Sequence, residues 1–201
     1  AAASEERQIT LMFTDIAGST DLTQQHGDAT AQDVVRLHNR VVRAALTAHQ
    51  GREVKHLGDG IMAAFNNTSD AVKAAIRIQR RVLIENDSAA VPFDIKIGIN
   101  AGEPVVEDND LFGSTVQLAA RIVDAAKARQ IFVSEVVRGI CNGKDFRFQD
   151  RGDRSLKGFK EPVPIYEVMW KAEVTEPKTE ISGPAAAAIP VAATAPLRQV
   201  S

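Results

Sequence analysis

Apolar residues recur along the chain at two different spacings. In several short segments every second residue is apolar, as in a strand with one buried face, whereas elsewhere apolar residues lie three or four positions apart, as in an amphipathic helix. The alternating segments predict strands over residues 8–15, 53–57, 61–65, 93–101, 131–133, 146–149 and 163–170. The helical spacing predicts helices over residues 29–50, 69–86 and 114–128, and a short helix after residue 134. Ser69 and Ser134 stand where helix-capping side chains are expected.

The order of these segments indicates the fold class. The chain opens with strand, helix, hairpin, helix and strand, and Gly58-Asp59-Gly60 is a hairpin signal between the second and third strands. This order is typical of a ferredoxin-like split β-α-β core, so we predict an α+β domain with a mainly antiparallel sheet and helices on one face. The other face of such a sheet needs cover, which a second copy of the chain would provide.

Composition divides the chain into three parts. Residues 1–7 form an N-terminal extension and residues 8–171 form the folded domain. Residues 172–201 are rich in Ala and Pro and poor in large apolar residues, so we expect a flexible tail there. The overall content of 44% hydrophobic and 25% charged residues is ordinary for a globular protein.

Charge and cysteine content restrict the class of partner. The formal net charge is −2, so no strong field attracts nucleic acid or an anionic membrane surface. Cys141 is the only cysteine, no run approaches the ~18 apolar residues of a membrane span, and the N-terminus lacks a secretory pattern. We therefore expect a cytoplasmic domain, with no nucleic-acid or membrane contact from this segment.

Two acidic residues stand at positions that the predicted fold brings together. Asp15 ends the first strand and Asp59 lies at the tip of the hairpin, which neighbours that strand in a split β-α-β sheet. Two adjacent carboxylates stay ionised at low cost only when a cation lies between them, and carboxylate oxygens favour Mg²⁺ or Mn²⁺. Taken singly, Asp15 would be a helix cap and Asp59 a turn residue; together they predict a metal site.

A loop of small residues follows Asp15 and leads toward the first helix. Its backbone N–H groups and the adjacent helix N-terminus are suited to a triphosphate. The loop lacks the lysine of a P-loop, which excludes a Walker-type NTPase. The candidate substrate-binding residues of this loop are Ile16, Ala17, Gly18, Ser19 and Thr20.

Several motifs in order make the chain similar to one known family. The runs from Phe13 to Thr20 and from Lys55 to Gly60 resemble the two metal motifs of class III nucleotidyl cyclase catalytic domains. Further matching segments are 98–102, 110–113, 119–121, 156–159 and 163–166. The resemblance extends from about Ile9 to Val168, and the short stretch between 102 and 110 is similar to the bacterial-type adenylate cyclases of the family.

The resemblance implies a role for each matching residue. Asp15 and Asp59 would hold two Mg²⁺ or Mn²⁺ ions with help from the Ile16 carbonyl, and Lys55 and Asp110 would read the purine. Arg121 would stabilise charge at the α-phosphate, Gln117 would orient the ribose, and Lys157 would contact the phosphates. The resemblance further implies a homodimer whose sites take the Asp pair from one subunit and the other residues from its partner. It leaves open a regulatory domain or partner outside this chain.

Hydrogen-bond chemistry favours ATP over GTP at such a site. Adenine offers an acceptor at N1 and a donor at its 6-amino group, which complement Lys55 and Asp110. Guanine presents the opposite pair, which would leave buried groups unpaired at a cost of ~1–3 kcal/mol each. We therefore predict an adenylate cyclase that converts ATP to cyclic AMP and pyrophosphate. Without the family motifs, Lys55 would be a solvated strand residue and Asp110 part of an acidic loop.

Two residues depart from the family pattern. Gln117 stands where these cyclases carry Asn, and Glu103 stands where the animal enzymes carry a phosphate-binding Arg. Both changes favour one alternative, a non-catalytic cyclase-like module for nucleotide sensing or dimerisation. A guanylate cyclase is a second alternative, which Lys55 and Asp110 disfavour.

Overall fold

The computed structural model describes residues 8–108 and 110–171. The predicted extension 1–7 and the predicted tail 172–201 lie outside the described residues. Among the described residues the main sheet has seven strands in the order β2-β3-β1-β4-β7-β9-β8. Their bounds are β1 Ile9–Ile16, β2 Arg52–His56, β3 Gly60–Phe65, β4 Ile95–Gly102, β7 Ile131–Ser134, β8 Phe148–Arg154 and β9 Val163–Val168.

The sheet is mainly antiparallel, which confirms the predicted α+β fold class. The single parallel pair in the main sheet, within the part of the chain described, is β4 with β7. A separate small hairpin is formed by β5 (Val105–Glu107) and β6 (Asp110–Phe112).

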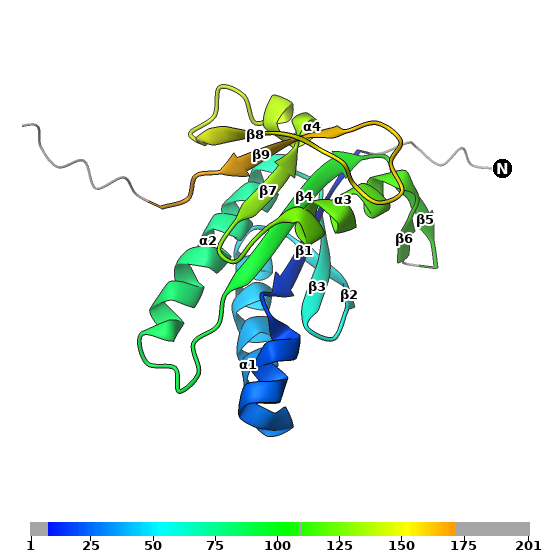
Figure 1. The fold of residues 1–201 in the computed structure, drawn as a ribbon. Helices are drawn as coiled ribbons and strands as arrows, with labels where there is room; N and C mark the ends of the chain where they lie inside the picture. Colours follow the sequence, from blue (N-terminus) through cyan, green and yellow to red (C-terminus); the bar gives the residue numbers. More distant parts are fainter. Residues whose placement is uncertain (1–7, 109, 172–201) are drawn as a thin grey trace, which may run out of the picture. The chain divides into compact units, whose positions relative to one another are not determined.

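The helices are divided between the two faces of the sheet (Figure 1). The long helices α1 (Ser19–Ala48) and α2 (Thr68–Asn86), with the short α4 (Glu135–Ile140), pack on one face. Helix α3 (Ser114–Ala125) packs on the opposite face beside β6, where its Ala119 and Val123 contact Leu11 and Phe13 of β1. The prediction that all helices share one face therefore holds for α1, α2 and α4 but not for α3.

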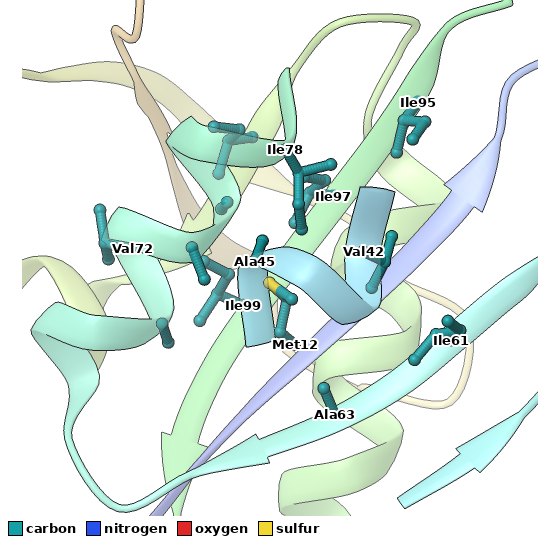
Figure 2. Packing of buried hydrophobic residues seen from close by; sticks show 14 of the residues in the cluster. Met12, Val42, Ala45, Ile61, Ala63, Val72, Ile78, Ile95, Ile97 and Ile99 are labelled. Atoms are coloured by element: carbon teal, nitrogen blue, oxygen red, sulfur yellow. The ribbon is translucent and has the colours of Figure 1, made fainter. Parts of the chain in front are cut away.

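Alternation along the strands produces the larger core. Ile95, Ile97 and Ile99 of β4 are fully buried against α1 and α2. Figure 2 shows Ile97 beside Ile78 of α2, within the cluster that also holds Val72. Burial of one such side chain contributes about 1.5–3 kcal/mol to folding, so this layer anchors β4 firmly beneath the two helices.

Three local predictions differ from the structure. Asn67, rather than Ser69, caps α2, because its side chain accepts the backbone N–H groups of Ser69 and Asp70. Helix α1 begins at Ser19 rather than at residue 29 and is interrupted at Gly27, where the polar stretch hides the helical spacing. The β5–β6 hairpin was not predicted, since strands of three residues are too short to show alternation. The predicted cap at Ser134 is confirmed by its bond from the Val137 N–H.

Two glycines permit close approaches that position the site. A Cβ at Gly60 would lie 2.1 Å from the Thr14 carbonyl oxygen, so β3 passes β1 at a distance that only glycine allows. A Cβ at Gly98 would lie 2.4 Å from the Val123 backbone nitrogen, so α3 rests directly on β4. Both contacts involve backbone atoms, which cannot move aside as a flexible side chain can.

We expect Gly60→Ala to lower the free energy of unfolding by about 3 kcal/mol or more, because the new methyl group would collide with the backbone of β1. Gly139→Ala is the matched control, since a Cβ there meets no atom within 4 Å and the residue lies inside α4. Urea unfolding should show that the control is as stable as the wild type or slightly more so. Equal stability of the two variants would contradict this account of Gly60.

Candidate active site

The ends of β1 and of the β2–β3 turn bring two carboxylates together. Asp15 pairs with Gly60 in the antiparallel register, and the Ile16 N–H donates to the Asp59 carbonyl at 3.1 Å. The carboxyl groups of Asp15 and Asp59 consequently interact with one another. The structure thus places these two residues side by side, as the hairpin and strand order predicted.

The charge of Asp15 is only partly compensated. Burial is the main cause that raises the pKa of Asp15, and the neighbouring charge of Asp59 raises it further. The Lys96 ammonium acts in the opposite direction, because its Nζ lies 2.8 Å from Oδ2 of Asp15. Lys96 stands opposite Asp15 in β4, so an ammonium group already contacts one of the two acids.

Lys96 was missed by the sequence analysis. Its position between Ile95 and Ile97 predicts that it faces away from the large core, but the cross-strand partner depends on the register of β1 against β4. No local sequence pattern specifies the register of β1 against β4, because it depends on how the buried faces of the two strands pack in the folded sheet.

The loop after Asp15 is more occupied with internal bonds than the sequence suggested. The Ile16 N–H bonds to Asp59, and the Ala17 N–H donates to the Asp94 carbonyl at 2.9 Å. The backbone N–H groups of Ser19 and Thr20 lie in the first turn of α1, where a helix leaves its donors without intrahelical partners. These first-turn amides, rather than those of Ile16 and Ala17, are the ones positioned to meet an anion.

Ser19 has a second role, because its hydroxyl donates to Oδ2 of Asp59 at 2.5 Å. This bond holds the Asp59 carboxylate beside the start of α1. A cavity of about 220 Å³ adjoins the bond, and its lining includes Ile16, Thr20 and Thr23 as well as Ser19 and Asp59.

A second charged couple joins β2 to the β5–β6 hairpin. The Lys55 Nζ donates to Oδ2 of Asp110 at 2.6 Å and lies 5.5 Å from the centre of the Phe112 ring. The bond from Lys55 is the main cause that holds the pKa of Asp110 below its usual range, with a smaller effect from the Leu111 N–H. The structure therefore joins the two residues that the family resemblance assigns to the purine.

The remaining predicted residues stand around α3. Gln117 and Arg121 lie one turn apart on this helix, where residues at i and i+4 share a face. Gln117 is exposed, whereas Arg121 is half-buried and donates to Asp124 at 2.9 Å. Lys157 is exposed in the loop after β8, next to Leu156, which packs against Ile122 of α3.

No hydrogen bond or ion pair between described residues joins the Asp15–Asp59 pair to the Lys55–Asp110 couple, or either of them to Gln117, Arg121 or Lys157. Within the same residues, no group of three or more His, Cys, Asp and Glu side chains could hold a metal ion. A cation at Asp15 and Asp59 would therefore take its other ligands from backbone oxygens, a nucleotide or water. No helix in the described ranges is long and apolar enough to cross a membrane.

Comparisons with known sequences and structures all point to one protein family. The model of the adenylate and guanylate cyclase catalytic domain matches residues 1–169. A protein of Rhizobium meliloti (strain 1021) that bears an adenylate cyclase name is 29% identical over 177 residues. That match covers 85% of this chain but only 30% of the relative's length, so the chain corresponds to one part of that longer protein.

Solved structures show the same fold with both types of cyclase. A Silicibacter pomeroyi structure described as an adenylate/guanylate cyclase/hydrolase is 28% identical, with a TM-score of 0.70, and the match covers 82% of this chain and 98% of that one. The guanylate cyclase domain of RhGC from Catenaria anguillulae, solved in complex with GTP, is 22% identical. Its TM-score is 0.73 and the match covers 83% of this chain and 98% of that one. The fold alone therefore does not distinguish ATP from GTP.

Replacing Lys55 with Met should raise the pKa of Asp110 toward its ordinary value, because the variant removes the bond that stabilises the ionised carboxylate. A lowered pKa means that the pair stabilises the fold at neutral pH and that this contribution is lost as the pH falls through the Asp110 pKa. NMR titration of the Asp110 carboxyl carbon measures the change. Lys127→Met, a change at an exposed lysine elsewhere, is the control; an unchanged Asp110 pKa in Lys55→Met would refute the pairing.

Proposed function

The chain belongs to the adenylate and guanylate cyclase catalytic domain family, and we propose that within this family it is an adenylate cyclase. It would convert ATP to 3′,5′-cyclic AMP and pyrophosphate at sites shared between two copies of the chain. The observation that carries the choice of ATP is the contact between Lys55 and Asp110.

The Lys55–Asp110 couple provides one donor and one acceptor at neighbouring positions. The Lys55 ammonium would donate to N1 of adenine, and the Asp110 carboxylate would accept from the 6-amino group. Guanine carries a hydrogen on N1 and an oxygen at C6, so in the same pose a donor would face a donor and an acceptor an acceptor. Each mismatch leaves a desolvated polar group unpaired, at a cost of about 1–3 kcal/mol.

The Asp15–Asp59 pair fits a hard divalent cation. Two carboxylates that repel one another lie together, and the Lys96 ammonium already contacts one of them. We assign Asp15 and Asp59 as the side chains that hold two Mg²⁺ or Mn²⁺ ions, with the Ile16 carbonyl as a further oxygen ligand. Bound there, the ions would lower the pKa of the attacking hydroxyl and neutralise charge on the triphosphate.

The reaction itself is an internal displacement at phosphorus. The ATP 3′-oxygen bonds to the α-phosphorus and loses its proton to solvent, while the bond from the α-phosphorus to the bridging oxygen breaks and pyrophosphate leaves with the electron pair. Arg121 would stabilise the charge that builds up on the α-phosphate, and Lys157 would bind the departing phosphates. Leu156 and Ile122 hold the loop of Lys157 against the helix of Arg121, which supports a joint action.

Gln117 keeps the amide with which the ribose would be oriented, but on a side chain one methylene longer than Asn. It lies exposed at the start of α3, where it has room to adjust. Small misplacements at a reacting centre are costly, so this residue would lower the rate rather than abolish the reaction.

The exposed hairpin supports a homodimer. Val105, Val106 and Phe112 of β5 and β6 are 60%, 63% and 45% exposed, which is unusual for large apolar side chains clustered in one element. Leu57 in the β2–β3 turn is also exposed, at 44%. Phe112 lies beside Lys55, and Leu57 lies in the turn that carries Asp59, so a second copy that covers them would stand next to both groups of site residues.

Purified protein incubated with Mn²⁺ and either ATP or GTP should form cyclic AMP at least about ten-fold faster than cyclic GMP, because guanine leaves the Lys55–Asp110 couple unsatisfied. Chromatography of the products measures both rates.

Asp59→Asn should lose activity by about a hundred-fold or more, because the variant lacks one of the proposed cation ligands. Asp87→Asn, the same change at an exposed acid at the C-terminal end of α2, is the matched control.

Two outcomes would decide against the proposal. Cyclic GMP as the main product would assign the domain to the guanylate cyclases. A folded protein that forms no cyclic nucleotide with either metal would favour a non-catalytic nucleotide-sensing module.

Mixing Asp15→Ala with Lys55→Ala should restore about a quarter of the wild-type rate per protomer, because half of the dimers would be mixed and each would hold one intact site. Cyclic AMP formation after mixing measures the recovery. Mixing Asp15→Ala with Asp59→Ala is the matched control, since both changes fall in the same half of the site and every mixed dimer has two damaged sites. Equal rates in the two mixtures would argue against shared sites.

A further inference from the structure

Behind the two carboxylates, a chain of hydrogen bonds crosses from β1 to the β2–β3 turn through α1. The Ile61 N–H donates to Oγ1 of Thr14 at 3.1 Å, and that hydroxyl lies 3.1 Å from Nε2 of His38. Nδ1 of His38 lies 2.9 Å from Oδ1 of Asn39. Asn39 in turn contacts Nε2 of His56, with Nδ2 at 3.0 Å and Oδ1 at 3.3 Å.

The last bond of this chain reaches the turn that carries Asp59. The Gly58 N–H donates to Nδ1 of His56 at 3.3 Å. The network therefore begins one residue before Asp15, at Thr14, and ends one residue before Asp59, at Gly58. Neither His38 nor Asn39 has any other role in the proposed reaction.

The bonding partners define which nitrogen of His38 carries the proton. The Asn39 Oδ1 can only accept, so Nδ1 of His38 donates to it and Nε2 is left as an acceptor for the Thr14 hydroxyl. That hydroxyl oxygen remains free to accept the Ile61 N–H. His38 is fully buried, and this burial lowers its pKa, which agrees with a neutral ring.

A purely apolar side chain would satisfy the packing at this position. His38 lies on the buried face of α1 with Val34, Val41 and Val42, where a leucine would need no partners. A buried polar group is costly unless it is hydrogen-bonded, so the ring is accommodated only because the network is complete. The presence of His38 therefore indicates that this position needs hydrogen bonds in fixed directions, and not only a side chain that fills the core.

The carboxylates themselves create that requirement. Asp15 and Asp59 repel one another, Lys96 contacts only Asp15, and Ser19 contacts only Asp59. We propose that His38 is a positioning residue that sets the spacing between Asp15 and Asp59, by joining the strand that carries one to the turn that carries the other. This inference rests on the proposed function, in which the two acids hold divalent cations.

The test compares two identical substitutions on the same face of β1. Thr14→Val removes the hydroxyl that donates to Nε2 of His38, whereas Thr10→Val removes a hydroxyl that bonds to Thr68 at 2.8 Å, near the far end of the strand. Both threonines are 2% exposed, but Thr14→Val leaves two buried partners unpaired and Thr10→Val leaves one, so both variants should lose unfolding free energy and Thr14→Val somewhat more, measured with urea. Thr14→Val alone should weaken Mn²⁺ binding by about ten-fold, because it disturbs a group that orients a cation ligand.

Binding is measured from the electron paramagnetic resonance signal of free Mn²⁺ in the presence of a non-hydrolysable ATP analogue. Equal Mn²⁺ affinity of Thr14→Val and Thr10→Val would overturn the inference and leave the proposed function intact. A folded wild-type protein that binds no Mn²⁺ would overturn the proposed function and the inference with it.

A second measurement tests the network without cations. Nitrogen NMR of the wild-type protein should show His38 neutral with its proton on Nδ1, and His38→Gln, which keeps an acceptor and a donor, should retain more Mn²⁺ affinity than His38→Leu. A proton on Nε2 would reverse the assigned directions and overturn the inference. Identical Mn²⁺ affinities for the Gln and Leu variants would do the same.

Discussion

The pairing of β1 with β3 on one side and β4 on the other places the charged groups at the carboxylate end of the site. In this register Asp15 stands opposite Gly60 in β3 and opposite Lys96 in β4. A shift of one residue would turn Asp15 toward the core of α1 and α2 and move Met12 out of that core to the opposite face of the sheet. The buried isoleucines of β4 and the close passage of Gly60 oppose such a shift, so packing far from the acids keeps them in place.

Electrostatics then explains why the two charged groups of the site differ. Asp15 is half-buried beside a second acid, and its pKa is raised even though Lys96 contacts it. Asp110 has a lysine partner and a backbone donor, and its pKa is lowered. The Asp15–Asp59 pair thus carries two negative charges against the one positive charge of Lys96, whereas the charges of Lys55 and Asp110 cancel. In the proposed function a cation would be attracted to the Asp15–Asp59 pair, and a neutral base with a matching donor and acceptor would suit the Lys55–Asp110 couple.

Much of this arrangement could be predicted from the sequence where the signal is local. The hairpin at Gly58-Asp59-Gly60, the alternation in β4 and the capping by Ser134 each depend on a few adjacent residues. The meeting of Asp15 with Asp59 follows from strand order. The family resemblance implied only that Lys55 and Asp110 read the same purine, and their contact was not predicted, because the β5–β6 hairpin that carries Asp110 is too short to show strand alternation.

Other features depend on contacts between residues that are distant in the sequence, so no short sequence pattern predicts them. Lys96 was missed because its partner is determined by cross-strand register, and His38 because a histidine on the buried face of a helix looks like ordinary packing. The placement of α3 depends on Gly98, whose missing side chain allows the helix to touch β4 but shows no periodicity. The cap of α2 was assigned two residues late, since Asn67 and Ser69 are both good capping residues.

The contact between Lys55 and Asp110 has a consequence for how a base would enter. Lys55 and Asp110 satisfy one another, so a base that inserts between them must first separate an ion pair. Only a ligand that supplies an acceptor to the lysine and a donor to the carboxylate recovers that loss. In the proposed cyclase this ion pair would therefore weaken the binding of every nucleotide, and it would weaken the mismatched ones most.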